Sequence, residues 1–203
     1  MKEVIAKITP SSEERQQFSS TIKFFLQTLN SKLKKVSAHA ILGGSGAKDT
    51  WIAESKEIDI FVLFDYKKYS SKTAELSVIL SPILKKTFAG KKIVRLHGSR
   101  DYFQVNYNGF TIEIIPILKI QNAEKAKNIT DISPLHAVWV NKKTKKLKNN
   151  IRLAKQFLKA NKLYGAESYI NGFSGYVVEI LITHYGSFTK FLQAARKWKG
   201  KEI

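Results

Sequence analysis

The sequence predicts an α+β fold, in which a sheet domain with flanking helices spans residues 1–130 and a small helical domain spans residues 131–203. Two observations predict this division. Apolar, β-branched segments recur up to about residue 118, and helical periodicity replaces them from about residue 120. A chain of 203 residues has room for one compact domain or for two small domains that share an interface.

The first domain begins with a helix. Ser11 and Glu14 have the spacing of a capping box, and apolar residues then recur at intervals of three and four, so we expect an amphipathic helix to about residue 35. A short buried strand over residues 37–42 follows. Glycines interrupt it, and a short helix is expected over residues 47–51.

The sheet is predicted from four further segments. Residues 58–64 form the strongest strand, because they are rich in β-branched and aromatic side chains. A helix over residues 72–88, which Pro82 breaks or kinks, separates it from the other strands. Asn108-Gly109 is a strong hairpin signal, since both positions of a tight hairpin turn need positive φ. The strands after the helix are expected at 92–97, 102–107 and 110–118.

The second domain is predicted to be helical. Its helices are expected at about 121–127, 148–162, 166–182 and 187–197, with the lysine-rich run 141–148 as an exposed loop or helix start. This pattern contains no internal repeat.

Composition limits the class of protein. There are 35 Lys and Arg residues against 16 Asp and Glu residues, a formal net charge of +19, which favours a polyanion such as nucleic acid as partner, although a solvated lysine-rich surface has the same composition. The absence of cysteine excludes disulfides, thiol nucleophiles and Cys-ligated metals. Apolar runs are too short for a membrane span and no signal peptide is visible, so a cytoplasmic location without membrane contact is expected.

Two groups of residues can carry chemistry. Gly44 and Ser45 form a turn after a strand, where backbone N–H groups can bind an anion. Glu57 and Asp59 are two positions apart in a strand and therefore share a face, and Glu113 lies within another apolar strand. Acidic side chains are rarely buried without a partner, so these three predict a site for hard divalent cations such as Mg²⁺.

These residues belong to a longer pattern. Gly-Ser-x-Ala-x-x-Thr-Trp and Glu-Ile-Asp-Ile-Phe, with the later blocks Asp-Ile-Ser-Pro-Leu-His, Arg-Leu-Ala-Lys, Tyr-Gly-Ala-Glu and Gly-Phe-Ser-Gly-Tyr, span residues 44 to 176. The pattern resembles the archaeal (class I) CCA-adding enzymes, which are tRNA nucleotidyltransferases of the polymerase-β superfamily. The resemblance covers the N-terminal half of that family and implies its nucleotidyltransferase fold.

The resemblance implies specific roles. Glu57, Asp59 and Glu113 correspond to the catalytic, metal-binding acids, which in that family hold two Mg²⁺ ions. Nucleotide binding is implied for six residues: Gly44, Ser45, Lys48, His136, Lys155 and Tyr164. Taken without the resemblance, the last three would be interpreted as a structural histidine, a solvated lysine and a packing tyrosine.

The implied activity is the template-independent addition of CCA to tRNA 3′ ends from CTP and ATP. Two alternatives stay open: a related transferase that extends another RNA or an oligoadenylate acceptor, and a catalytically inactive RNA-binding protein. Lys48 and Glu113 depart from the usual Arg and Asp of the family. Family members are also about twice as long. The resemblance therefore implies either a separately encoded C-terminal half that binds tRNA or a shortened form of the enzyme that associates with itself.

Overall fold

A computed structural model describes residues 1–166 and 168–199. It separates into two compact units, each of which is described by itself. The sheet unit comprises residues 12–48 and 55–137, and the helical unit comprises residues 1–11, 49–54 and 138–203.

The sheet unit is built on a five-stranded mixed sheet with the strand order β1-β2-β5-β4-β3. β2 and β5 run parallel, and the other neighbouring pairs, β1 with β2, β5 with β4 and β4 with β3, are antiparallel. The register places Asp59 of β2 opposite Glu113 of β5. The strands are β1 (Ala38–Leu42), β2 (Glu57–Phe64), β3 (Ile93–Leu96), β4 (Tyr102–Tyr107) and β5 (Phe110–Leu118).

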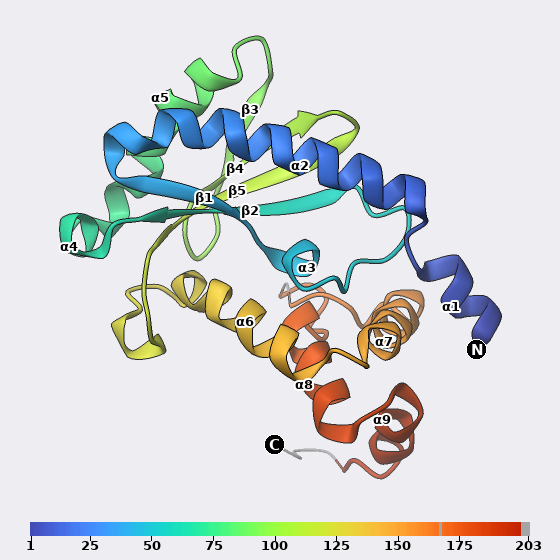
Figure 1. Cartoon of the computed structure of the whole chain (residues 1–203). Helices are drawn as coiled ribbons and strands as arrows, with labels where there is room; N and C mark the ends of the chain where they lie inside the picture. Colours follow the sequence, from blue (N-terminus) through green and yellow to red (C-terminus); the bar gives the residue numbers. More distant parts are fainter. Residues whose placement is uncertain (167, 200–203) are drawn as a thin grey trace. The chain divides into compact units, whose positions relative to one another are not determined.

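Two long helices cover one face of this sheet (Figure 1). They are α2 (Ser12–Leu33) and α5 (Leu76–Thr87), and two single-turn helices, α3 (Gly44–Ala47) and α4 (Tyr66–Tyr69), follow β1 and β2. Alternate residues of β2 and β5 point toward the covered face, as the twofold repeat of a strand requires. They form a core with α2 and α5 whose largest fully buried side chains include Phe25, Leu29, Ile60, Phe64, Leu80, Leu84, Ile112 and Ile114.

The helical unit has its own core. α1 (Lys2–Ile8), α7 (Lys148–Ala160), α8 (Gly175–Tyr185) and α9 (Phe188–Ala195) contribute its buried side chains, and α6 (Ser133–Lys143) runs across the boundary between the two sequence ranges. The core residues are Ile8, Ile151, Leu153, Ala154, Leu158, Val178, Ile182, Phe188 and Phe191. Ala53 donates its backbone N–H to Ile8 at 2.9 Å, which fixes residues 49–54 against α1.

The structure confirms the α+β class and the strand positions. The Asn108-Gly109 hairpin is present, with φ of 49° and 80° at the two residues, because asparagine and glycine tolerate this region best. The division into units differs from two continuous domains, since residues 1–11 and 49–54 pack with the C-terminal helices. The functional labels of the two predicted domains stay predictions.

Several predicted helices are wrong in position. The helix expected at 47–51 is instead α3, which begins at Gly44. Residues 121–127 contain only a 3-10 turn, and the helix expected from residue 166 begins at Gly175, where the Ser174 hydroxyl caps it. Pro82 lies inside α5 without ending it. α1 and α6 were not predicted: α1 has only seven residues, and the apolar side chains of α6 do not follow one face.

Among the described residues, no helix combines the length and the apolar character that a membrane crossing requires.

Candidate active site

Three carboxylates lie on one face of the two parallel strands. Glu57 and Asp59 are separated by one residue of β2, so their side chains emerge on the same side. Glu113 of β5 is the register partner of Asp59. Ile58, which lies between Glu57 and Asp59, and Ile112, which precedes Glu113, are buried on the opposite face, which α2 and α5 cover. The alternation and register of the strands therefore place all three acids that the sequence predicted on one face of two neighbouring strands.

Burial raises the pKa of the Glu113 carboxyl above its ordinary value, and the nearby charges of Asp59 and Glu57 raise this pKa further. A hydrogen bond acts in the opposite direction, because Gln104 donates its side-chain N–H to Glu113 at 3.3 Å. Burial, with the negative charge of Glu113, also raises the pKa of Tyr102. The site is consequently a region of concentrated negative charge, which a cation would stabilise.

Two glycines allow the backbone of the β1–α3 turn to approach β2 closely. Gly43 donates its N–H to the Asp59 carbonyl at 2.7 Å. A Cβ atom on Gly43 would overlap the Phe61 ring, and one on Gly44 would overlap the Asp59 carboxylate. Gly44 also has φ of 51°, which other residues rarely adopt. Only glycine at position 44 lets the first turn of α3 lie against the Asp59 carboxylate.

The donor set suits a hard divalent cation. Three carboxylates supply oxygen ligands of the kind that Mg²⁺ prefers, and Gln104 already orients one of them. As the side chains stand, no three His, Cys, Asp or Glu residues within the described ranges converge closely enough to hold a metal ion. Like charges keep carboxylates apart when no cation lies between them. Metal binding by Glu57, Asp59 and Glu113 therefore stays a prediction.

The other predicted residues of the sheet unit lie around this turn and at the start of α6. Ser45 is the second residue of α3, and Lys48 follows the helix with a largely buried side chain. His136 is half-buried in the first turn of α6. Ser45 shares a single helical turn with Gly44, which abuts the Asp59 carboxylate.

Lys155 is buried in the helical unit and not on a solvated face. Its ammonium group donates to the Thr50 hydroxyl at 3.0 Å and to the Glu179 carboxylate at 3.1 Å, and the Thr50 hydroxyl donates to the same carboxylate at 2.7 Å. Glu179 is itself fully buried. Two opposite charges and a hydroxyl thus compensate one another where water is excluded.

Tyr164 lies close to Lys155 in the same unit. A Cβ atom on Gly175 would lie 2.7 Å from the Tyr164 hydroxyl and 3.9 Å from Lys155 Cε, so this glycine keeps space open between the two side chains. The Lys159 ammonium lies 5.3 Å from the centre of the Tyr164 ring. Two predicted nucleotide-binding residues therefore meet at the start of α8.

Sequence comparison decides the relationship. Residues 149–203 match the family model described as the second domain of tRNA nucleotidyltransferase. The CCA-adding enzyme of Nanoarchaeum equitans is 46% identical over 160 residues, which cover 79% of this chain and 39% of that protein. The CCA-adding enzyme of Methanocaldococcus jannaschii is 32% identical over 208 residues, which cover 100% of this chain and 46% of that protein.

This chain is a relative of the archaeal CCA-adding enzymes. It matches their N-terminal half and spans less than half the length of the curated relatives it matches.

Solved structures show the same nucleotidyltransferase fold. The Escherichia coli MS115-1 CdnC structure with ATP has a TM-score of 0.70 at 19% identity and covers 95% of this chain and 69% of that chain. A cytoplasmic RNA terminal U-transferase has a TM-score of 0.63 at 19% identity and covers 90% of this chain and 51% of that chain. At these identities the likeness concerns the fold alone.

Reasoning from the sequence missed the polar residues that fix the segment 49–51 to the helices. Arg152 is buried and donates to the Asp49 carboxylate at 2.7 Å and to the Trp51 carbonyl at 2.9 Å. With Thr50 and Glu179, it completes a polar network in this relative of the CCA-adding enzymes. The only signal in the sequence was a pair of basic residues, Arg152 and Lys155, three positions apart on an otherwise apolar helix face.

Proposed function

We propose that this chain is the nucleotidyl-transferring part of an enzyme that adds CCA to tRNA 3′ ends from CTP and ATP. The observation that carries the proposal is the placement of Glu57, Asp59 and Glu113 on one face of β2 and β5, beside the Gly44 turn. The archaeal relatives named CCA-adding enzymes support the choice of reaction.

In the proposed reaction, the 3′ hydroxyl of the RNA attacks the α-phosphorus of the bound nucleotide. A new P–O bond forms, the bond to the bridging oxygen of the β-phosphate breaks, pyrophosphate leaves, and the hydroxyl proton is released. Glu57, Asp59 and Glu113 would hold Mg²⁺, two ions by analogy with the family, which supply Lewis-acid stabilisation of the negative charge that develops.

Six residues are proposed to hold the nucleotide. We propose that the turn formed by Gly44 and Ser45, with Lys48, binds the triphosphate through backbone N–H groups, a hydroxyl and a cation. His136, Lys155 and Tyr164 are proposed to complete the nucleotide site by donating hydrogen bonds and by offering an aromatic face. Lys48 keeps the positive charge of the usual arginine but lacks its paired donors, so a lower affinity for the triphosphate is expected.

Nucleotide incorporation tests the proposal. Purified protein, MgCl₂, labelled CTP or ATP and tRNA that lacks its 3′ CCA are incubated, and products are resolved at single-nucleotide length. The reaction is run with the chain alone and with the C-terminal part of the Methanocaldococcus jannaschii relative added as a separate polypeptide. Size-exclusion chromatography of both mixtures reports self-association or assembly. Ordered addition of C, C and A in either mixture supports the proposal.

Asp59→Asn is the decisive variant, because it removes a proposed metal ligand with almost no change in volume. Incorporation should fall by at least 10³-fold, which corresponds to about 4 kcal/mol of transition-state stabilisation. Glu75→Gln is the control, since Glu75 is an exposed acid at the start of α5 and takes no part in the proposed reaction. Undiminished incorporation by Asp59→Asn would refute the metal assignment.

Nucleotide preference separates the alternatives. Addition of only one kind of nucleotide, or extension of an acceptor other than tRNA, would identify a different nucleotidyltransferase. RNA binding without any Mg²⁺-dependent product would identify an inactive RNA-binding protein.

A further inference from the structure

A lysine-lined pocket lies at the carboxyl ends of β2 and β5, where both strands leave the sheet. Its volume is about 310 Å³. Lys67, Lys119 and Lys125 are its exposed cations, and Asp65 is the single acid among its lining residues. Tyr66 and Gln121 add a ring and an amide to the same lining. None of these residues belongs to the proposed catalytic or nucleotide-binding set.

The sheet builds this pocket directly. β2 and β5 are parallel, and Phe64 and Leu118 are register partners at their carboxyl ends, so the segments that follow both strands leave the sheet side by side. Lys119 donates its backbone N–H to the Phe64 carbonyl at 2.8 Å, which fixes the two segments together. Asp65 accepts the Lys68 N–H at 3.0 Å as the cap of α4, so part of its hydrogen-bonding capacity is already used.

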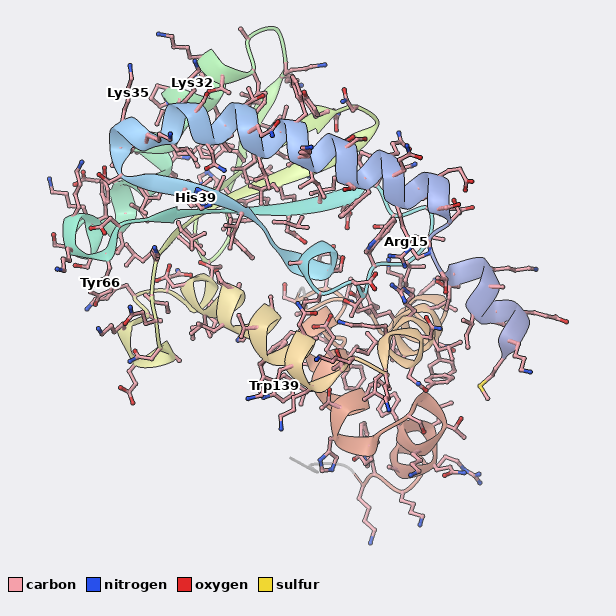
Figure 2. The ribbon with its side chains drawn as sticks, viewed as in Figure 1. Arg15, Lys32, Lys35, His39, Tyr66 and Trp139 are labelled. Carbon is pink, nitrogen blue, oxygen red and sulfur yellow. The ribbon has the colours of Figure 1, made fainter. Side chains whose placement is uncertain are left out.

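A second lysine-lined groove lies at the same end of the sheet unit. It has a volume of about 290 Å³, and its residues are Lys32, Lys35, Val36, Ile83, Lys86 and Thr87. The Tyr69 hydroxyl donates to the Val36 carbonyl at 2.8 Å, and the Asp65 N–H donates to the Ser37 carbonyl at 3.0 Å, so α4 is fixed to the segment that follows α2. Figure 2 shows Lys32, Lys35 and Tyr66 at the same end of the sheet unit, with Arg15 at the other.

This surface lies several residues along the strands from the three proposed catalytic acids. The register pair of Asp59 and Glu113 precedes that of Phe64 and Leu118 by five residues on each strand. At about 3.3 Å per residue, this corresponds to roughly 17 Å. A nucleotide bound at the acids therefore could not reach the pocket with its own phosphates, and the pocket needs a longer ligand or a separate one.

We propose that the pocket and the groove at the same end of the sheet unit bind backbone phosphates of the RNA, away from its reacting end. Six lysines line the two depressions against one acid, and lysines bind phosphates as mobile point charges that do not read base sequence. Tyr66 offers a face on which an unpaired base can stack. The inference rests on the proposed function only in choosing RNA as the polyanion.

The salt dependence of tRNA binding tests this proposal. The affinity for labelled tRNA is measured by fluorescence anisotropy at a series of KCl concentrations, for wild type and for Lys67→Gln/Lys119→Gln/Lys125→Gln. Each lost phosphate contact lowers the slope of log K against log[salt] by about 0.7–0.9. The slope should therefore fall by about 2, and the affinity at 0.1 M KCl should fall on the order of a hundredfold.

A charge-matched control separates a specific surface from overall charge. Lys23→Gln/Lys91→Gln/Lys92→Gln also removes three positive charges, but from exposed positions of the sheet unit outside both depressions. Its slope should stay within about 0.5 of wild type. Equal slopes for the two triple variants would overturn the proposal. Thermal unfolding of both variants verifies that they are folded.

Binding of ATP and of inorganic phosphate, measured by calorimetry, identifies the source of the phosphate. If the pocket variant loses affinity for these small anions while its tRNA slope is unchanged, the pocket is a site for free phosphates and the proposal is wrong. Because these measurements need no turnover, they also separate the two proposals. A reduced slope in a protein that incorporates no nucleotide would contradict the proposed function and leave the RNA surface supported.

Discussion

The carboxyl groups of Glu57, Asp59 and Glu113 share one face of the sheet, where the charges of Asp59 and Glu57 make ionisation of Glu113 less favourable. The raised pKa of Glu113 expresses this repulsion together with burial. A fold that keeps three acids together gives up stability for a binding function, which is common at catalytic sites. The proposed metal ions would reverse the sign of the interaction.

A substitution at Glu113 tests this balance. Glu113→Gln should raise the melting temperature in EDTA by about 2–4 °C, the shift that about 1 kcal/mol produces at this chain length. Added MgCl₂ should raise the melting temperature of wild type more than that of the variant, because a ligand that binds the folded state stabilises it. Differential scanning fluorimetry with and without MgCl₂ measures both effects.

The control for this experiment is Glu124→Gln, which removes an exposed acid from the loop after β5. It should leave the response to MgCl₂ unchanged. A Glu113→Gln protein that melts below wild type in EDTA would show that the hydrogen bond from Gln104 outweighs the repulsion.

A second residue gives a pH-dependent prediction. Hydrogen bonds from His97 and Arg95, at 2.8 Å each, lower the pKa of Asp101 below its ordinary value. A lowered pKa in the folded state stabilises the protein above the unfolded pKa of about 3.9, and this contribution disappears as the pH falls through the folded value. Asp101→Asn should therefore melt below wild type at pH 7, and the two melting curves should converge in acid. Parallel pH profiles would contradict this expectation.

The sequence could predict the acids but not which of the cations are buried. Alternation along β2 places Glu57 and Asp59 on one face, whereas the position of Glu113 on the same face depends on the register between β2 and β5. Lys155 was assigned to nucleotide binding by resemblance alone, and its burial depends on Thr50, 105 residues earlier. No local pattern reports a contact between residues so far apart in sequence.

At the scale of elements, the turn between β1 and α3 is the most constrained part of the sheet unit. Gly44→Ala combines a φ of 51° with overlap of the Asp59 carboxylate. We expect it to destabilise the protein by about 2–4 kcal/mol, because the strain at positive φ, about 1–2 kcal/mol, adds to the cost of moving Asp59. Urea denaturation measures the free energy of unfolding.

Gly90→Ala is the matched control for the turn. Gly90 has φ of 81°, but no atom lies within 4 Å of the position that its Cβ would occupy. It should therefore show the backbone strain alone, about 1–2 kcal/mol. Equal losses at the two glycines would mean that the close approach to Asp59 contributes nothing to the free energy of unfolding.

The polar network that joins α7 to α8 gives the second prediction at this scale. Glu179→Leu should destabilise by about 3–5 kcal/mol, since it leaves the Lys155 ammonium buried without its counter-charge. Lys155→Met/Glu179→Leu should recover most of this loss, because both charges are then replaced by apolar groups. A double variant no more stable than Glu179→Leu would contradict the ion-pair interpretation.

The elements that could be predicted were those with a strong local signal. β2, β4 and β5 follow from their composition and from the Asn108-Gly109 turn, which acts within four residues. The position of α3 could not be read in the same way, since no local pattern shows that this glycine-rich turn lies against Asp59 and Phe61. α6 was missed because its apolar side chains do not follow one face.

At the scale of the whole molecule, residues that are neighbours in the sequence do not always pack in the same unit. Residues 49–54 leave the sheet unit and belong to the helical unit before the chain returns to form β2. The segment is held there by Arg152, Lys155 and Glu179. A boundary drawn from composition is necessarily continuous, so this exchange could be learned only from long-range contacts.

Each unit nevertheless has a separate core, and this predicts how the molecule responds to a destabilising substitution in either core. Leu80 is fully buried in the sheet unit, and Ile182 is fully buried in the helical unit. Truncation of either to alanine should cost about 2–5 kcal/mol. Because stability is local, Leu80→Ala should lower amide-exchange protection mainly in β2, β4 and β5, and Ile182→Ala mainly in α7 and α8. Hydrogen exchange read by mass spectrometry measures both patterns.

The two variants serve as controls for each other, since both remove a similar apolar volume. Equal loss of protection in both units, from either substitution, would show that the chain opens as one cooperative body in spite of its two cores. Losses of protection confined to one unit would mean that the core beneath the acids on β2 and β5 stays folded when the core around Lys155 is destabilised. Variants of Asp59 and of Lys155 could then be interpreted separately, because a loss of activity from one substitution would not be caused by unfolding of the other unit.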